Sequence, residues 1–209
     1  MERAAAAWRR NESSRTGNRE AEYRLKQSDS LQGEQRLAAY LNGETAHPES
    51  VRPYLGKLGG AHGAMRVALV LPRNRTTLVN QRYDGDGELF LFAVNNIAHE
   101  VLMPYGSYVL CRLDPYQWAL LIAEGGQGGK GGLPLDHKSV LRQLSEAWHR
   151  TIGLSVFIGR AGGTAKFEQL HEAVSEARVS LMKSMILGSE KTNEAERPGN
   201  GPRLSDRRG

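Results

Sequence analysis

The sequence has few of the residues on which several common classes of protein depend. Its 209 residues include one cysteine, Cys111, so no disulfide can form within the chain, as is usual in a reducing cytosol. Cys111 lies in an apolar stretch, which predicts a buried, unreactive thiol. No window approaches the roughly eighteen apolar residues of a membrane-spanning helix, and MERAAAAWRR has too short an apolar run for a signal peptide. We therefore expect a cytoplasmic protein without membrane contact.

Neither sign of charge dominates the composition. The 28 basic and 23 acidic residues give a formal net charge of +5, and residues of opposite sign are interspersed along most of the chain. Aromatic residues make up 7% and show no regular spacing that would favour stacking on nucleic-acid bases. Direct nucleic-acid binding through the basic ends stays open as an alternative, but the composition does not require it.

Motifs for metal, cofactor or catalytic chemistry are incomplete. His99 and His171 each precede a glutamate on an expected helix, but Met103 and Ser175 stand where a zinc-protease helix would have its second histidine. Residues 126–131 satisfy G-x-G-x-x-G, yet the segment Leu133-Pro134-Leu135 intervenes before Asp136 starts the next helix, which predicts a plain flexible loop. No nucleophile-elbow motif occurs. We expect no metal and no cofactor.

Composition divides the chain into five segments. Polar, charged ends flank a middle with repeating apolar residues. Gly43 and Gly188 are predicted to end the helices that precede them. The segments are a disordered N-terminal extension (1–19), a helical lead-in (20–44), a connector (45–64), a folded domain (65–188) and a disordered tail (189–209).

Within 65–188 the pattern predicts the order β-α-β-β-α-β-α, an α/β (α+β) fold with a mixed sheet of the split β-α-β kind found in ferredoxin-like and nucleotide-cyclase palm domains. Asp136 is predicted to cap the second helix. The expected elements are a strand (65–71), a helix (88–103), a hairpin (107–123), a helix (137–151), a strand (153–159), a glycine loop (160–164) and a helix (166–186). The expected core residues are Phe90, Val94, Ile97, Val101, Leu144, Trp148, Phe167, Leu170, Val174 and Leu181.

The hairpin has an unusual turn sequence. In SYVLCRLDPYQWALLIAE, Asp114 and Pro115 are well suited to the first two positions of a tight turn. Arg112 and Asp114 are expected to pair beside the turn, which contributes little at a surface.

Three strings resemble a known family. GELFLFAVNNIAHEVL resembles the Phe-Ala-Val-x-Asn-Ile-x-x-Glu-Ile helix of the degenerate GGDEF-like domain in YesN-type regulators of the AraC family. TIGLSVFIGRAGGTAKFEQLHEAVSEARVSL resembles the closing strand, loop and helix of that domain, and RLAAYLNGE resembles the helix that leads into it. The resemblance covers roughly residues 20–188.

The resemblance implies a fold shared with diguanylate cyclases. Active cyclases carry Gly-Gly-Asp/Glu-Glu-Phe at the hairpin turn. There the glycines let the protein backbone approach the nucleotide, and the acids hold a divalent metal. This sequence instead has a degenerate signature turn, with Trp118 at the Phe position and Gln117 in place of a carboxylate. Arg73 follows the first strand, where a metal-binding acid would stand. The resemblance therefore implies a non-catalytic domain. The signature-turn residues are Asp114, Pro115, Tyr116, Gln117 and Trp118.

These observations favour a non-catalytic regulatory or signal-transmission domain of an AraC-family (YesN-type) transcription regulator or two-component response regulator. Its expected partners are a second copy or neighbouring regulator domains, and the broad apolar helix stripes suit such contacts. The family binds DNA through a helix-turn-helix pair, which we expect this chain to lack. The alternatives are a nucleotide or small-molecule binding module that has lost catalysis, and an enzyme of another class.

Overall fold

The structure, a computed structural model, describes part of the chain. The described residues are 31–45, 49, 51–55, 64–124 and 136–195. The predicted N-terminal extension, residues 20–30 of the predicted lead-in, most of the predicted connector, the glycine loop at 126–131 and the predicted tail beyond residue 195 lie outside these ranges.

Four strands form one sheet in the order β2-β3-β1-β4, and every neighbouring pair is antiparallel. Because β3 is antiparallel to both β1 and β2, the parallel pair β1 and β2 is split by β3. This is the predicted split β-α-β arrangement. The expectation of a mixed sheet is wrong, because no two parallel strands are neighbours. Strands β1 and β2 are parallel but lie on either side of β3, and strands β3 and β4 are parallel but lie on either side of β1. The strands are β1 (Met65–Pro72), β2 (Tyr108–Arg112), β3 (Trp118–Ala123) and β4 (Val156–Ala165).

The helices include one that the sequence does not predict. Helix α3 contains a single buried residue, Leu78, so no repeating apolar stripe marks it. The described helices are a segment at 31–41, α2 (Arg52–Leu55), α3 (Arg75–Arg82), α4 (Gly87–Leu102), α5 (His137–Ile152) and α6 (Leu170–Ala195), with short 3-10 turns η3 (Met103–Tyr105) and η4 (Phe167–Gln169).

Helix caps lie largely where the sequence predicts them. Asp136 accepts a hydrogen bond from the Lys138 amide at 3.2 Å and begins α5. After the helix at 31–41, Gly43 has a φ of 76° and its amide donates to the Tyr40 carbonyl at 3.0 Å. The Glu44 amide donates to the Ala39 carbonyl at 2.9 Å, which completes a Schellman motif. The predicted stop at Gly43 is confirmed.

Two predicted boundaries around β4 are wrong. Gly153, with a φ of 74°, ends α5 instead of beginning the strand, which starts at Val156. The expected glycine loop at 160–164 is part of β4, because Arg160 and Thr164 at its two ends pair with Ala68 and Arg66 of β1. A register shift between Arg66 and Ala68 of β1 accommodates the difference in strand length.

The predicted end of α6 is also wrong. The helix continues past Gly188 to Ala195. A Cβ atom at Gly188 would lie 2.8 Å from Cε1 of Phe157 in β4. The glycine therefore permits close packing of α6 on the sheet and does not stop the helix.

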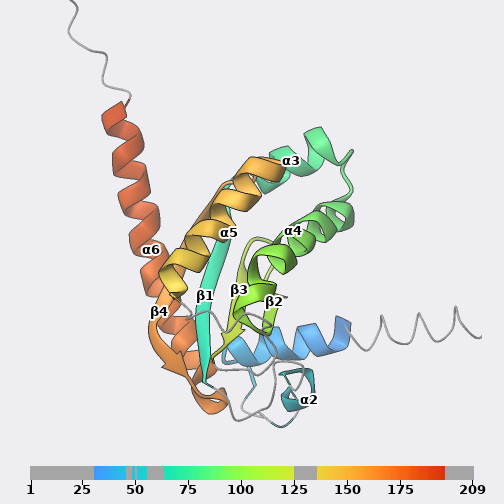
Figure 1. Ribbon diagram of the computed structural model, residues 1–209, viewed down its shortest axis with the longest axis vertical. Coiled ribbons are helices and arrows are strands. Elements are labelled where there is room, and N and C mark those ends of the chain that lie inside the picture. Colours follow the sequence, from blue (N-terminus) through green and yellow to red (C-terminus); the bar gives the residue numbers. More distant parts are fainter. Residues whose placement is uncertain (1–30, 46–48, 50, 56–63, 125–135, 196–209) are drawn as a thin grey trace, which may run out of the picture.

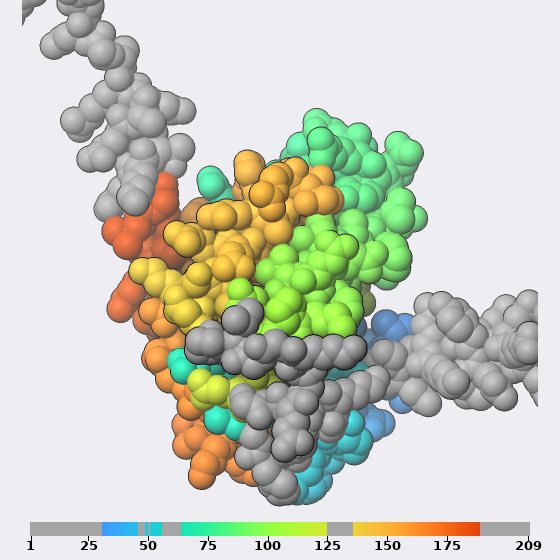
Figure 2. All heavy atoms as spheres, in the orientation of Figure 1, coloured from blue at the N-terminus to red at the C-terminus, as the bar shows by residue number. Residues whose placement is uncertain are grey.

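Helices cover both faces of the sheet, as Figure 1 shows. Helices α3, α4 and α5 pack on one face, and α6, α2 and the helix at 31–41 pack on the other. Figure 2 shows α4 and α5 side by side at the surface of the layer that α3, α4 and α5 form. The predicted core residues are buried except Val101, which is half-buried.

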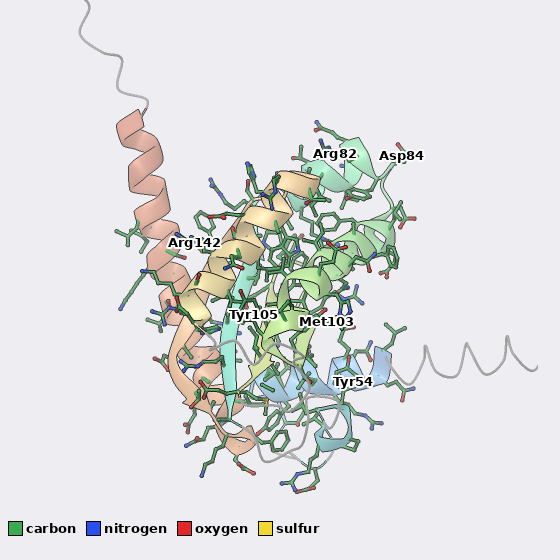
Figure 3. The ribbon with its side chains drawn as sticks, viewed as in Figure 1. Tyr54, Arg82, Asp84, Met103, Tyr105 and Arg142 are labelled. Atoms are coloured by element: carbon green, nitrogen blue, oxygen red, sulfur yellow. The ribbon has the colours of Figure 1, made fainter. Side chains whose placement is uncertain are left out.

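Helix α4 runs from the turn that follows α3 to η3. Figure 3 labels Arg82 and Asp84 where α3 turns into α4, and Met103 and Tyr105 at the opposite end. There the Tyr105 hydroxyl donates a hydrogen bond to Oε1 of Gln143 in α5 at 3.1 Å. None of the described helices has both the length and the apolar character needed to cross a bilayer.

Candidate functional site

The C-terminal end of β1 and the turn of the β2–β3 hairpin lie at the same end of the strands, which we call the edge of the sheet. Val70 of β1 lies opposite Trp118 of β3, which in turn lies opposite Arg112 of β2. Residues 71–74 and 114–117 therefore lie at the same edge. The fold brings together the two segments at which the resemblance implies a cyclase would hold its metal.

The hairpin turn is stabilised by the carboxylate of its own Asp114. The Leu113 amide donates to the Gln117 carbonyl at 2.9 Å. Asp114 Oδ1 accepts hydrogen bonds from the amides of Tyr116 at 2.6 Å and Gln117 at 2.8 Å. These bonds form the local turn that an aspartate favours, with Pro115 at the next position. The Asp114 oxygen is thus engaged in holding the backbone of the turn.

Trp118 belongs to the core and not to the surface of the edge. It is 1% exposed, and its ring centroid lies 6.3 Å from that of Phe90 and 6.1 Å from that of Trp148. The indole nitrogen of Trp148 donates to the Val94 carbonyl at 3.0 Å. This aromatic cluster holds the base of the hairpin against α4 and α5.

The residues after β1 also have structural contacts. The Arg73 guanidinium lies 4.6 Å from the ring centroid of Phe157, a cation–π contact. The Asn74 side chain donates to the Gly153 carbonyl at 2.9 Å and accepts from the Ser155 amide at 3.0 Å. Within the described ranges, no group of three or more His, Cys, Asp or Glu side chains is placed to hold a metal ion.

Arg112 makes ion pairs that the sequence did not indicate. Its amide donates to Oε1 of Glu34 at 2.9 Å, and its guanidinium lies 3.5 Å from Glu34 and 3.4 Å from Glu88. The predicted pair between Arg112 and Asp114 is wrong, because the Asp114 oxygen faces its own turn. Glu34 and Glu88 are 78 and 24 residues away in the chain, so no local spacing could have identified them.

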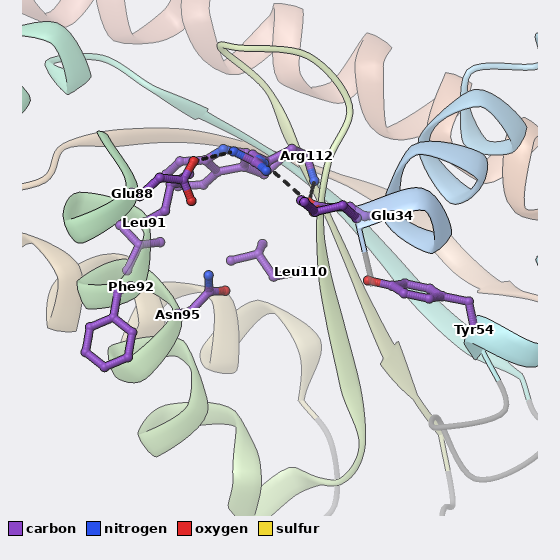
Figure 4. Close-up of a pocket in the computed structure, with 11 residues that line it drawn as sticks. Glu34, Tyr54, Glu88, Leu91, Phe92, Asn95, Leu110 and Arg112 are labelled. Carbon is purple, nitrogen blue, oxygen red and sulfur yellow. Dashed lines mark hydrogen bonds and ion pairs between the residues drawn. The ribbon is translucent and has the colours of Figure 1, made fainter. Parts of the chain in front are cut away.

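These ion pairs border a pocket of about 440 Å³ between α4, the hairpin and the helix at 31–41 (Figure 4). Its floor is apolar, and Asn95 contributes an amide from α4. Because the two carboxylates outweigh the single positive charge of Arg112, the pocket has little attraction for an anion such as phosphate. Its chemistry suits a neutral ligand that carries both polar and apolar groups. The lining residues are Leu31, Glu34, Tyr54, Glu88, Leu91, Phe92, Val94, Asn95, Leu110, Arg112 and Trp118.

Cys111 has the buried environment that the sequence predicts, and the two histidines of the incomplete zinc motifs are exposed. Cys111 is buried, and burial followed by the nearby charge of Glu34 raises the pKa of its thiol to about 12, so the thiolate is scarce at neutral pH. His99 and His171 are exposed, each beside an exposed glutamate on its helix. The predicted burial of Cys111 is confirmed.

Comparison with known proteins gives distant structural similarity alone. No protein-family model matches the sequence, and no curated protein matches it. The chain is similar to the GGDEF domain of DgcB from Caulobacter crescentus, solved in complex with c-di-GMP, with 12% identity, a TM-score of 0.43, and coverage of 67% of this chain and 82% of that chain. It is also similar to the diguanylate cyclase SiaD from Pseudomonas aeruginosa, solved with its activator SiaC, with 16% identity, a TM-score of 0.45, and coverage of 90% and 72%.

Both similar structures are diguanylate cyclases or their GGDEF domains. At these scores the likeness is one of chain layout, and it establishes neither a shared family nor a shared activity. The α/β palm arrangement of this chain rests on its own strand order and pairing.

Proposed function

We propose that this chain is a non-catalytic regulatory and signal-transmission domain of an AraC-family (YesN-type) transcription regulator or two-component response regulator, built on a cyclase-like fold. The observation that carries the proposal is the edge formed by β1 and the hairpin turn. The Asp114 carboxylate accepts hydrogen bonds from two amides of the turn. Gln117 and Arg73 occupy positions at which the resemblance implies acidic residues in an active cyclase.

A physical argument supports the loss of chemistry at this edge. Displacement at a phosphate needs a cation that neutralises developing negative charge, and a divalent cation needs several oxygen ligands in one place. The edge offers one carboxylate already bonded to two amides, and a cation at Arg73 that repels a metal ion.

The test is an assay for cyclase activity on the full chain. The protein is incubated with GTP or ATP in the presence of Mg²⁺ or Mn²⁺, beside an active cyclase that shows the assay works. We expect no cyclic dinucleotide above the background without protein. Circular dichroism on the same sample establishes that the protein is folded. Sustained formation of a cyclic dinucleotide would overturn the proposal.

A regulatory domain acts through contacts, so we also propose that this one associates with a second copy or with neighbouring regulator domains. DNA recognition is not assigned to the described surface, since its acidic and basic residues are interspersed. Salt-sensitive retention of the chain on DNA would contradict this assignment.

The pocket beside Arg112 favours a second candidate function, the binding of a neutral small molecule. A ligand that binds the folded state stabilises it by about 2.7 kcal/mol at one hundred times its dissociation constant. A thermal-shift screen should therefore detect such a ligand. Asn95 lines the pocket and its exposed neighbour Asn96 does not. A genuine pocket ligand should lose affinity in Asn95→Ala and keep it in Asn96→Ala.

A further inference from the structure

Helix α6 has an exposed apolar stripe on its outer face. Val179, Met182 and Ile186 are 54%, 57% and 61% exposed, and Ser175 precedes them on the same stripe. The spacing of four, three and four residues is that of the core positions of a coiled coil. We call Ser175, Val179, Met182 and Ile186 the outer seam.

The opposite face of α6 has the same spacing and is already covered. Leu170, Val174, Ala177 and Leu181 are buried against the sheet. The body of the molecule therefore lies on one side of α6, and the outer seam faces away from it. Figure 1 shows α6 at the margin of the molecule, reaching past the sheet at its C-terminal end.

The charges beside the outer seam select an orientation for a second helix. Glu176 and Lys183 lie on one flank, seven residues apart, and Arg178 lies on the other flank. In a parallel pair opposite flanks meet, so Lys183 would face the flank of Arg178, whose guanidinium donates to Oδ1 of Asn42 at 3.1 Å, and would find no acidic partner there. In an antiparallel pair the same flanks meet, so Glu176 faces Lys183 of the other copy twice across a two-fold axis.

We propose that two copies of this chain associate through antiparallel packing of their outer seams. Val179 of each copy packs against Met182 of the other, Ser175 packs against Ile186, and the two Glu176–Lys183 pairs flank the contact. This inference rests on the proposed regulatory function, because it assigns a surface to the self-association proposed for that function. A contact based on four seam positions per helix is small, so the dimer is weak and concentration-dependent.

The first experiment measures self-association of the full chain by sedimentation over a range of concentrations. We expect a reversible dimer, and Met182→Glu should raise its dissociation constant by roughly tenfold or more because a charge enters an apolar contact. The control is Met103→Glu, since Met103 is also 57% exposed but lies on η3. A monomer at all concentrations, or equal effects of both variants, would overturn the proposal.

The second experiment tests the charge pairs. Glu176→Lys and Lys183→Glu should each weaken the dimer several-fold, and the double variant should restore it. Glu176 also accepts a hydrogen bond from the Gly162 amide at 2.8 Å. That bond is lost in Glu176→Lys and in the double variant alike, so recovery in the double variant reports the intermolecular pair. Failure of the double variant to recover would contradict the pairing.

The third experiment determines orientation by disulfide cross-linking. A mixture of Val179→Cys and Met182→Cys chains should cross-link to heterodimers faster than either variant cross-links with itself. Native Cys111 is fully buried and does not compete. Preferential self-cross-linking of each variant would mean a parallel pair and would overturn the proposal. The cyclase assay remains separate, since activity would refute the regulatory function whether or not the dimer forms.

Discussion

His137 is the buried polar residue of the core at the start of α5. It is 3% exposed, and neither ring nitrogen has a hydrogen-bond partner among the described residues. Burial lowers the pKa of His137 to about 4, with further lowering by Arg66 and Arg160 and an opposing effect from Asp136 and Glu124. The imidazole is therefore neutral in the folded state at neutral pH.

This environment predicts a loss of stability in mild acid. The unfolded chain protonates His137 near its ordinary pKa of about 6.5, while the folded chain resists protonation until about pH 4. Stability is thus full above this window and falls as the pH drops through it. We expect a loss of about 2 kcal/mol from this residue between pH 7 and pH 4.5.

Urea unfolding at a series of pH values measures the effect. The His137→Leu variant, which cannot titrate at this position, should show a flatter decline in its free energy of unfolding than the wild type. His149→Leu changes an exposed histidine on the same helix and should keep the wild-type decline. An identical pH dependence in all three proteins would contradict the assignment to His137.

At the scale of elements, β4 and α6 approach closely at Gly159. A Cβ atom at this position would overlap the Ala177 carbonyl oxygen and the Leu181 amide nitrogen of α6. The strand can therefore pack on the helix only because this residue has no side chain. The close approach belongs to the pair of elements, since Gly163 on the same strand has open space around it.

We expect Gly159→Ala to lower the free energy of unfolding by about 3 kcal/mol, because backbone atoms must move to admit the methyl group. Gly163→Ala should change stability by less than about 1 kcal/mol. Chemical denaturation of both variants measures the difference. Equal midpoints would show that α6 can shift on the sheet at little cost.

On the scale of the whole molecule, the helix at 31–41 shares the core of the later segments. Leu37 and Leu41 are almost fully buried in the cluster that contains α6 and one face of the sheet. Tyr40 stacks on Phe167 with ring centroids 5.4 Å apart, and its hydroxyl donates to the Phe167 carbonyl at 2.9 Å. The lead-in helix thus covers part of the sheet together with α6.

This shared core predicts that the helix and the sheet unfold together. Leu37→Ala should destabilise the whole protein by about 3 kcal/mol, whereas Leu31→Ala, at a position 46% exposed, should cost less than about 1 kcal/mol. Circular dichroism and tryptophan fluorescence should report the same transition midpoint in each variant. Separate midpoints would mean that the helix detaches before the sheet unfolds.

Local signals were sufficient for much of the fold and for part of the site. Apolar runs and capping residues predicted β1, α4, the hairpin and α5, because these elements bury a regular stripe or a whole strand. The turn at Asp114 and Pro115 was predictable since its hydrogen bonds lie within four residues. Helix α3 was missed because its single buried residue leaves no periodic pattern to detect.

The chain's own pattern of residues thus settles the order of the elements that bury a regular stripe or a whole strand, and the hairpin with its carboxylate-capped turn, since both depend on neighbours close in sequence. Tertiary structure alone decides the antiparallel strand order, the extension of β4 through its glycines, and the pairing of Arg112 with Glu34 and Glu88. Each of these depends on partners tens of residues away, whose position is set when the sheet assembles and not by local propensity.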